Sequence, residues 1–390
     1  MAERGDLEAA AAAGVITTEQ VAPLHDFLGA RQAARAAQPV PEGEETLRFI
    51  RNFHDVFLAI GIVILAAGVI ALIFSIMSES GRMAGGDMLI GAAVAFALAA
   101  GGMWGLGEYF ARRRRLFLPA IAICCSFALF AALSAAMLTG AAFGTDGGPM
   151  NDWPARLAFF VAAAAGCAAA ALFYARYRLP FALGLAGGLS VWSLLSFVFL
   201  AAPHAAGDLF LWIWLFGGIG LFVAGVWFDM RDPERKTRFS DNGFWLHLAA
   251  APLILTGVLG LISSLFTPGR ALTPGSSWEL IARAAQSDQA AVPQAIATLL
   301  VVAALGFVSL LINRRALIVS ALITTGIAIG VLMEAMNLGG GALLAGTLIA
   351  LGGLVLILGA GWGSARRALL ARVKPDGIWA RVFPPETVAE

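Results

Sequence analysis

Apolar runs of about 20 residues dominate this sequence and constrain its fold more than any other feature. A helix rises about 1.5 Å per residue, so each run is long enough to cross a hydrocarbon core of about 30 Å. Inside lipid, backbone N–H and C=O groups need partners within the protein, and a helix provides them. We therefore predict an all-α, polytopic integral membrane protein with about ten transmembrane helices. The predicted spans are Val56–Met77, Met88–Phe110, Leu116–Leu138, Trp153–Tyr174, Pro180–Ala202, Leu209–Trp227, Phe244–Phe266, Ala295–Ile312, Ala316–Met333 and Ala342–Trp362.

The composition favours the same class. Hydrophobic residues make up 59% of the 390 residues and charged residues only 13%, whereas soluble domains have about 25% charged residues. A soluble core of this length could not bury so much apolar surface, so the main predicted partner is the lipid bilayer. The net charge is +1 and the basic residues are spread over many loops, which argues against a nucleic-acid partner.

Lysine and arginine are distributed unevenly between the two sides of the predicted membrane. Short loops rich in these residues stay in the cytoplasm. With the N-terminus inside, the outer side has only four of the 26 Lys and Arg, namely Arg82, Arg156, Arg270 and Arg283. We therefore predict a multi-pass protein of the inner (plasma) membrane with both termini in the cytoplasm. No basic segment precedes an apolar core at the N-terminus, so we expect the first span to direct insertion without a cleavable signal peptide.

The composition also predicts three regions along the chain. Residues 1–45 are predicted to form a cytoplasmic helical hairpin and a linker, because a helix breaks at Gly14 and because Thr17 and Gln20 have the spacing of a capping box. Gln38–Glu45, rich in Pro, Gly and Glu, is the linker. Residues 46–364 are the ten-helix transmembrane domain, and residues 365–390 are a cytoplasmic C-terminal tail. A second capping box, in residues 276–279, predicts a short helix on the outer interface.

Four segments carry a resemblance to a group of known sequences. They are "GVITTEQ" (residues 14–20), "AIGIVILAAGVIALIF" (59–74), "RRRRLFLP" (112–119) and "YRLPFALGLAGG" (177–188). With them, the chain resembles bacterial inner-membrane proteins of unknown function that pair a cytoplasmic helical hairpin with many transmembrane helices. The charged stretch that begins at Asp229 also looks like loops of alphaproteobacterial members of such groups. This resemblance implies a membrane location and a helical fold, and it implies no catalytic or binding residue.

The stretch Asp229–Asp241, between the sixth and seventh predicted spans, contains four basic and four acidic residues. The basic residues are sufficient for a cytoplasmic orientation, to which acids contribute little. One interpretation is an ordered loop, in which Asp232 caps a short helix with acid–base pairs four residues apart and Asp241 caps the seventh span. The other is a solvated loop whose charges keep it out of the lipid. Asp232, Arg235 and Asp241 are therefore candidate functional residues.

His247, Pro252 and Glu334 complete the set of candidates. His247 lies in the seventh span, roughly 9 Å along the helix from Asp241. It is either a neutral histidine hydrogen-bonded to a neighbouring helix or a pH-sensitive or ligand-facing group beside the helix weakened by Pro252. Glu334 either lines an outer vestibule or ends a helix. No Asp, Glu, Lys or Arg lies in the middle of a predicted span, so we expect no relay of carboxylates at the membrane midplane.

The sequence contains no HExxH, no CxxC and no glycine-rich phosphate loop. We therefore predict that the protein is not an enzyme and has no catalytic, cofactor-binding or metal-binding residue. Glycine pairs four residues apart recur instead, and such pairs let helix backbones approach closely. They indicate tight packing of one bundle, sliding interfaces of a transporter or a homodimer face. The pairs are Gly101 and Gly105, Gly184 and Gly188, Gly326 and Gly330, and Gly359 and Gly363.

Two functions are compatible with this pattern. The first is a transporter-like permease for a small uncharged or amphipathic solute, because ten spans with both termini inside allow two five-helix halves of opposite orientation. The alternative is a non-transporting scaffold or sensor that recruits a cytoplasmic protein partner through the hairpin and the 229–241 loop. Either function is compatible with a homo-oligomer.

The predicted topology can be tested with reporter fusions. A reporter that is active only in the cytoplasm should work when fused after Arg113, Lys236 or Glu390, because these positions follow or lie in basic inner segments. A reporter that is active only in the periplasm should work after Gly147 or Ser287. Cytoplasmic activity of the Gly147 fusion would contradict the topology.

Overall fold

The computed structural model describes residues 4–37, 53–79, 86–144, 152–232, 239–266, 291–314 and 340–373, together with residues 322, 325, 326, 329 and 382. The regular structure in these ranges is helical, without a strand, in agreement with the predicted all-α class. The helices are α1 (Arg4–Ala12), α2 (Thr18–Ala37), α3 (Phe53–Glu79), α4 (Gly86–Gly107), the π-helix η1 (Glu108–Arg113), α5 (Phe117–Phe143), α6 (Trp153–Tyr177), α7 (Pro180–Ala201), α8 (Pro203–Arg231), α9 (Phe239–Phe266), α11 (Ala291–Ile312) and α13 (Gly340–Val373).

Several predicted features lie outside these described residues. They are the linker at residues 38–45, the outer-interface helix and nearly all of the predicted span Ala316–Met333. The predicted span Ala342–Trp362 lies within α13, which continues to Val373 and so includes the first residues of the predicted C-terminal tail. The count of ten spans therefore stays a prediction.

Within the described ranges, seven helices are long and apolar enough to cross a membrane: α3, α4 with η1, and α5 to α9. Many of their large apolar side chains point away from the protein, among them Leu98, which is 72% exposed, and Ile64, which is 65% exposed. Exposing so much apolar surface to water is unfavourable, whereas hydrocarbon matches it. These helices therefore form a membrane-embedded bundle. The apolar helix at Ile296–Ile312, within α11, is shorter than the seven.

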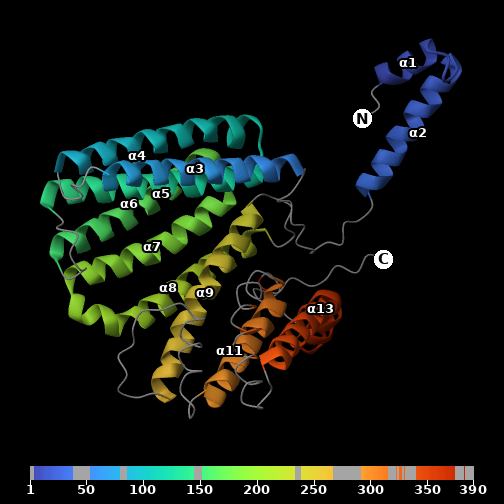
Figure 1. Cartoon of the computed structure of the whole chain (residues 1–390). Coiled ribbons are helices and arrows are strands. Elements are labelled where there is room, and N and C mark those ends of the chain that lie inside the picture. The colour runs from blue at the N-terminus through green and yellow to red at the C-terminus, as the bar shows by residue number, and fades with distance from the viewer. Residues whose placement is uncertain are drawn as a thin grey trace. The chain divides into compact units, whose positions relative to one another are not determined.

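Helices α3 to α7 share one apolar core, and α5 lies among α3, α4, α6 and α7 (Figure 1). Its centre is aromatic: Phe96 of α4, Phe130 of α5 and Phe173 of α6 have no exposed surface. The rings of Phe96 and Phe130 stack with their centroids 6.1 Å apart. Large rings fill the space between helices that expose their other faces to lipid, so this core gives the first part of the bundle a fixed arrangement.

Helices α1 and α2 belong to a separate compact unit, Met1–Glu45 with Glu386–Glu390, whereas Thr46–Pro385 form the second unit. The two helices contact each other and are joined at Gly14, whose φ of 73° suits glycine. The side-chain carbonyl of Gln20 accepts a hydrogen bond from the Thr17 backbone N–H at 3.0 Å, as the capping-box spacing predicts. Leu7 and Val21 are buried, while Phe27 remains 58% exposed.

Helices α8 and α9 pack antiparallel along most of their lengths. Leu211, early in α8, lies against Gly260, late in α9, and Asp229, near the end of α8, lies against Gly243, near the start of α9. Glycines occur on both sides of this contact, which we call the glycine seam: Gly218 and Gly225 on α8, and Gly243, Gly257 and Gly260 on α9. In lipid, where no hydrophobic force drives helices together, such close approach gains van der Waals contact.

The glycines that pack closely are mostly not the predicted ones. Of the predicted pairs, Gly184 does approach a neighbour, since a Cβ there would lie 2.8 Å from the Trp245 carbonyl oxygen. Gly101, Gly105 and Gly188 have no atom of another helix within 4 Å of that position. Tight packing within one bundle was therefore wrong for these three, whereas a homodimer face stays a prediction. Four-residue spacing places glycines on one face without showing what covers that face.

The ends of α4, α6, α8 and α11 and the starts of α5, α7 and α9 lie together, and we call this side the arginine end of the bundle (Figure 1). Three non-glycine residues there have a left-handed backbone: Arg115, Arg178 and Asn313, with φ of 53°, 52° and 55°. This conformation ends a helix and lets its last carbonyls accept hydrogen bonds, as when the Arg178 N–H donates to Tyr174 O at 2.8 Å.

The glycine seam yields a stability prediction. In Gly218→Ala, the new Cβ would lie 2.9 Å from the backbone nitrogen of Ile254, so the helices must separate. Overpacking of this kind costs about 1–3 kcal/mol, more than the roughly 1 kcal/mol that alanine gains over glycine in a helix. Thermal unfolding of the purified protein in detergent should therefore occur at a lower temperature.

The matched control is Gly220→Ala, two residues further along α8, where no atom lies within 4 Å of the new Cβ. This variant should be as stable as the wild type or more stable, by up to about 1 kcal/mol. Equal destabilisation by both substitutions would show that the seam is not closely packed.

Candidate functional site

A buried cluster of charged side chains joins α8, α9 and the end of α11. The Asp229 carboxylate of α8 lies 3.0 Å from His247 Nε2 of α9. The same carboxylate accepts a hydrogen bond from Arg314 Nε at 3.1 Å and a second from Arg314 Nη2. His247 has no exposed surface, Arg314 is 2% exposed, and the Asp229 side chain is 12% exposed. We call these three residues the Asp229 cluster.

Two glycines of the seam make room for this cluster. A Cβ at Gly225 would lie 2.8 Å from His247 Cε1, and a Cβ at Gly243 would overlap the Asp229 carboxylate. Phe222, one turn before Gly225 on α8, covers the imidazole with the ring centroids 5.0 Å apart. The histidine and the carboxylate therefore fit between α8 and α9 only because both helices lack side chains at these positions.

Arg314 reaches the carboxylate because of the way α11 ends. The left-handed backbone at Asn313 turns the chain, and the Arg314 N–H donates to the Ser309 carbonyl at 2.9 Å. The Ser309 hydroxyl in turn donates to the Arg314 carbonyl oxygen. Trp362 of α13 donates its indole N–H to Asn313 Oδ1 at 3.0 Å. The cluster thus ties α8 and α9 to α11, and Asn313 extends the connection to α13.

The charges of the cluster are balanced around one carboxylate. An ionised Asp229 and a charged Arg314 together have no net charge, so the whole cluster is neutral with a neutral His247. A carboxylate can only accept, so Nε2 must carry the hydrogen in the bond to Asp229. Nδ1 is then the lone-pair nitrogen of the neutral ring; it is buried and has no hydrogen-bond partner. The cluster can therefore hold α8, α9 and α11 together, and one ring nitrogen of His247 is left without a hydrogen-bond partner.

The structure brings only one of the six predicted candidates into this cluster. His247 is bonded to a neighbouring helix, which was one of the two alternatives. Pro252 lies inside α9, but its ring is exposed and so faces away from the fully buried His247. Arg235 and Glu334 lie outside the described residues.

The two acidic candidates have other positions than expected. Asp232 follows α8 as its C-cap residue, and the short helix that it was predicted to cap would lie outside the described residues. Asp241 does not precede its helix, because α9 already begins at Phe239 and Asp241 lies in the first turn. The prediction that Asp241 caps the helix was therefore wrong. An acid in the first turn still interacts favourably with the positive end of the helix dipole.

Asp229 itself was predicted to lie in the connection between two spans, and this was wrong, while the side of the membrane on which it lies stays a prediction. Helix α8 continues through Arg231, so Asp229 is helical and points into the bundle. It can be buried there because Arg314 neutralises its charge. Neither Asp229 nor Arg314 was among the candidates. The signal that could have found Asp229 is its place on the glycine stripe, since it follows Gly225 by four residues and Gly218 precedes Gly225 by seven.

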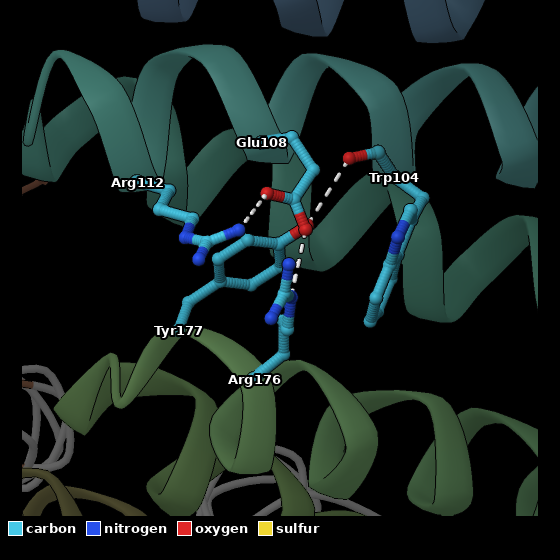
Figure 2. A network of polar contacts seen from close by, with 5 residues as sticks. All are labelled: Trp104, Glu108, Arg112, Arg176 and Tyr177. Atoms are coloured by element: carbon cyan, nitrogen blue, oxygen red, sulfur yellow. Dashed lines mark hydrogen bonds and ion pairs between the residues drawn. The ribbon is translucent and has the colours of Figure 1, made fainter.

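A second polar network joins α4 with η1 to the end of α6 (Figure 2). Glu108 pairs with Arg176 at 2.7 Å and with Arg112 at 3.1 Å. The Tyr177 hydroxyl donates to the Trp104 carbonyl at 3.2 Å. These side chains are partly exposed at the arginine end, and they lock two helix ends together without a buried charge.

Aromatic and amide contacts connect the two networks across the arginine end. Buried Asn242, in the first turn of α9, donates to the Tyr174 hydroxyl of α6 at 3.0 Å. The Trp245 ring meets Phe181 of α7 at 4.9 Å and Phe117 of α5 at 6.4 Å. Among the described residues, no group of three or more His, Cys, Asp and Glu is arranged to hold a metal ion.

Comparisons with protein-family models, with curated proteins and with solved structures found no match to this chain. The function is therefore inferred from the sequence and the structure alone.

The Asp229 cluster can be tested by removing its charges singly and together. Asp229→Asn and Arg314→Met each leave one buried charge without its partner, which costs about 3–5 kcal/mol. The double variant removes both charges and should lose less stability than the sum of the single losses, by about 1–3 kcal/mol. Denaturant unfolding of the purified proteins in detergent measures all three.

Asp208→Asn is the matched control, because it makes the same change at an exposed position of the same helix. It should alter stability by no more than about 0.5 kcal/mol. Strictly additive losses in the double variant would contradict a direct interaction between Asp229 and Arg314.

Proposed function

We propose that this protein is a permease for a small uncharged or amphipathic solute, in which the Asp229 cluster forms the contact that opens and closes at the arginine end. The observation that supports the proposal is a buried ion pair at the joint between two helix groups. In the described residues, α11 meets α9 through a small apolar contact of Ile312 with Ala251, and it meets α8 through the ion pair of Arg314 with Asp229. In this part of the chain, no aromatic core comparable to that of α3 to α7 lies at either contact.

An ion pair is an unexpected choice for a permanent joint inside a membrane protein. Well-packed apolar residues of the same volume often stabilise as much as a buried ion pair, or more. Ionisable groups within membrane helices are expensive, and those that persist usually belong to a pathway or a moving element. A charged contact can also exchange its protein partner for water when it opens, which an apolar contact cannot do. These arguments favour a gate over a static brace.

The proposal includes the predicted topology. With ten spans and both termini in the cytoplasm of a bacterial cell, the arginine end faces inward, because the basic loops stay inside. The Asp229 cluster then lies near the inner surface: Asp229 is two residues from the end of α8, and His247 is about 12 Å from the start of α9, at roughly 1.5 Å per residue. A gate at this depth would control exchange between a midplane site and the cytoplasm.

A second candidate function is a membrane scaffold or sensor that recruits a cytoplasmic protein partner. The observation that favours it is the separate compact unit with α1 and α2, in which Val15 is 76% and Phe27 58% exposed. Exposed apolar side chains on a small helical unit suit docking to another protein. In this function the transmembrane bundle would position the hairpin, and no solute would cross.

Solute flux into proteoliposomes tests the permease. Vesicles with and without the full chain are mixed with hyperosmotic glycerol, urea or acetamide, and light scattering follows their reswelling. At least one solute should enter several-fold faster with the protein. Asp229→Asn and Arg314→Met should change that rate several-fold, because they weaken the inner contact, whereas Asp208→Asn should not.

Deletion of Ala2–Pro39 separates the two functions. A permease should keep its full rate, because the hairpin is outside the transmembrane unit. Rates equal to those of protein-free vesicles for every solute would contradict the permease and leave the scaffold as the better explanation.

A further inference from the structure

Six arginines gather where η1 and α6 end. Arg112 to Arg115 follow one another at the end of η1, and Arg176 and Arg178 lie at the end of α6. The Glu108–Arg176 ion pair holds the two helix ends side by side (Figure 2). All six residues are exposed. We call this surface the arginine ridge.

The ridge has a large excess of positive charge. Glu108 is its only acidic contact in the described part of the chain, and it faces Arg112 and Arg176. Arg113, Arg115 and Arg178 form no ion pair with any described carboxylate. Exposed positive charge that the protein leaves uncompensated attracts an anion from outside.

Tyrosines fix the height and direction of two of these arginines. Arg114 donates to the Tyr109 hydroxyl at 3.0 Å and lies 5.5 Å from the centre of that ring. Arg178 lies 5.9 Å from the centre of the Tyr174 ring. Tyrosine prefers the level of the lipid headgroups, where its ring meets hydrocarbon and its hydroxyl meets water. The guanidinium groups are therefore held at the depth of lipid phosphates.

Two of the arginines occupy positions where glycine would fit with less strain. Arg115 and Arg178 both have left-handed backbones, which helices usually end with glycine. Arginine at both equivalent turns indicates that the charge has a use beyond ending the helix. Orientation alone does not require it, since basic residues are abundant in the other inner loops.

The surface leading to the ridge is apolar and open. Leu172, one turn before Arg176 on α6, is 54% exposed. On α4, no neighbouring helix lies within 4 Å of the position that a Cβ would take at Gly101 or Gly105, and Tyr109 follows on the same face. An acyl chain could therefore lie along this surface while its headgroup meets the arginines. A free phosphate ion would use only the charges and gain nothing from the apolar part.

From this arrangement we propose that the arginine ridge is a binding site for the phosphate headgroup of an anionic phospholipid. Basic surfaces between transmembrane helices on the inner side suit such headgroups, and arginine can bind phosphate through two parallel hydrogen bonds. The site requires membrane embedding but not transport, so it stands or falls separately from the permease.

Native mass spectrometry of the full chain in detergent tests the site with two defined lipids, dioleoylphosphatidylglycerol and dioleoylphosphatidylcholine. The wild type should bind the anionic lipid with a saturable stoichiometry and at least ten-fold more tightly than the zwitterionic one. Arg115→Gly with Arg178→Gly should weaken that binding by roughly ten- to thirty-fold, because each arginine contributes about one kcal/mol near a charged surface. The thermal midpoint should not fall, because glycine relieves the left-handed turns.

Three further variants make the result decisive. Arg115→Lys with Arg178→Lys keeps the charge and should retain most of the binding. Arg113→Gln, at an exposed helical position, should weaken binding without affecting either turn. Arg231→Gln removes an exposed arginine from the end of α8, outside the ridge, where it packs on Trp227 at 3.5 Å, and should leave binding unchanged.

Several outcomes would overturn the proposal. Equal affinity for the two lipids would exclude recognition of the anionic headgroup. Equal losses in Arg231→Gln and Arg113→Gln would mean diffuse attraction by total charge, with no defined site. Displacement of the lipid by millimolar inorganic phosphate would assign the ridge to a soluble anion instead. None of these outcomes bears on solute flux through the bundle.

Discussion

The close approach of α8 and α9 is the contact on which the rest of the functional argument depends. In lipid, helices gain little from hiding apolar surface from each other, so they associate through backbone contact at small residues. The glycine seam provides this contact. It also creates the space in which a histidine and a carboxylate can lie between two helices, because Gly225 and Gly243 each face one of them. The same glycines therefore account both for the close packing of α8 and α9 and for the burial of His247 and Asp229 between them.

A carboxylate in such a position requires a positive partner, and this requirement shapes the C-terminal half of the described chain. The partner of Asp229 is Arg314, which lies 85 residues later in the sequence. Arg314 is available because α11 ends in a left-handed turn at Asn313, and Trp362 of α13 bonds to that same asparagine. The Arg314–Asp229 pair thus connects α11 to α8, beside the apolar contact of Ile312 with Ala251 of α9.

Seven of the predicted transmembrane helices are confirmed in the described residues, whereas only His247 of the Asp229 cluster could be predicted from the sequence. A run such as Pro180–Ala202 has the length and composition of a span, and the observed helix is Pro180–Ala201. Length and hydropathy are properties of the segment itself, so they predict a span without any knowledge of the helices that pack against it. The Asp229–Arg314 pair is not local: Asp229 was assigned to the stretch between two spans, and Arg314 was not among the candidates. The four-residue spacing of Gly101 and Gly105 likewise showed that they share a face, but it could not show that no helix of the same chain packs there.

Charge at the arginine end is used in two physically different ways. The arginines at the ends of η1 and α6 are exposed, where a charge costs little, and in our proposal they bind an anionic headgroup. The buried pair at Asp229 is removed from water, where a charge is stable only while its partner is in place. A headgroup on the ridge would further fix α4 and α6, which Glu108 and the aromatic core already join. In the proposed permease, the first helices would be the fixed part, and α11 would move at its contacts with α8 and α9, which consist of the Arg314–Asp229 ion pair and the apolar contact of Ile312 with Ala251.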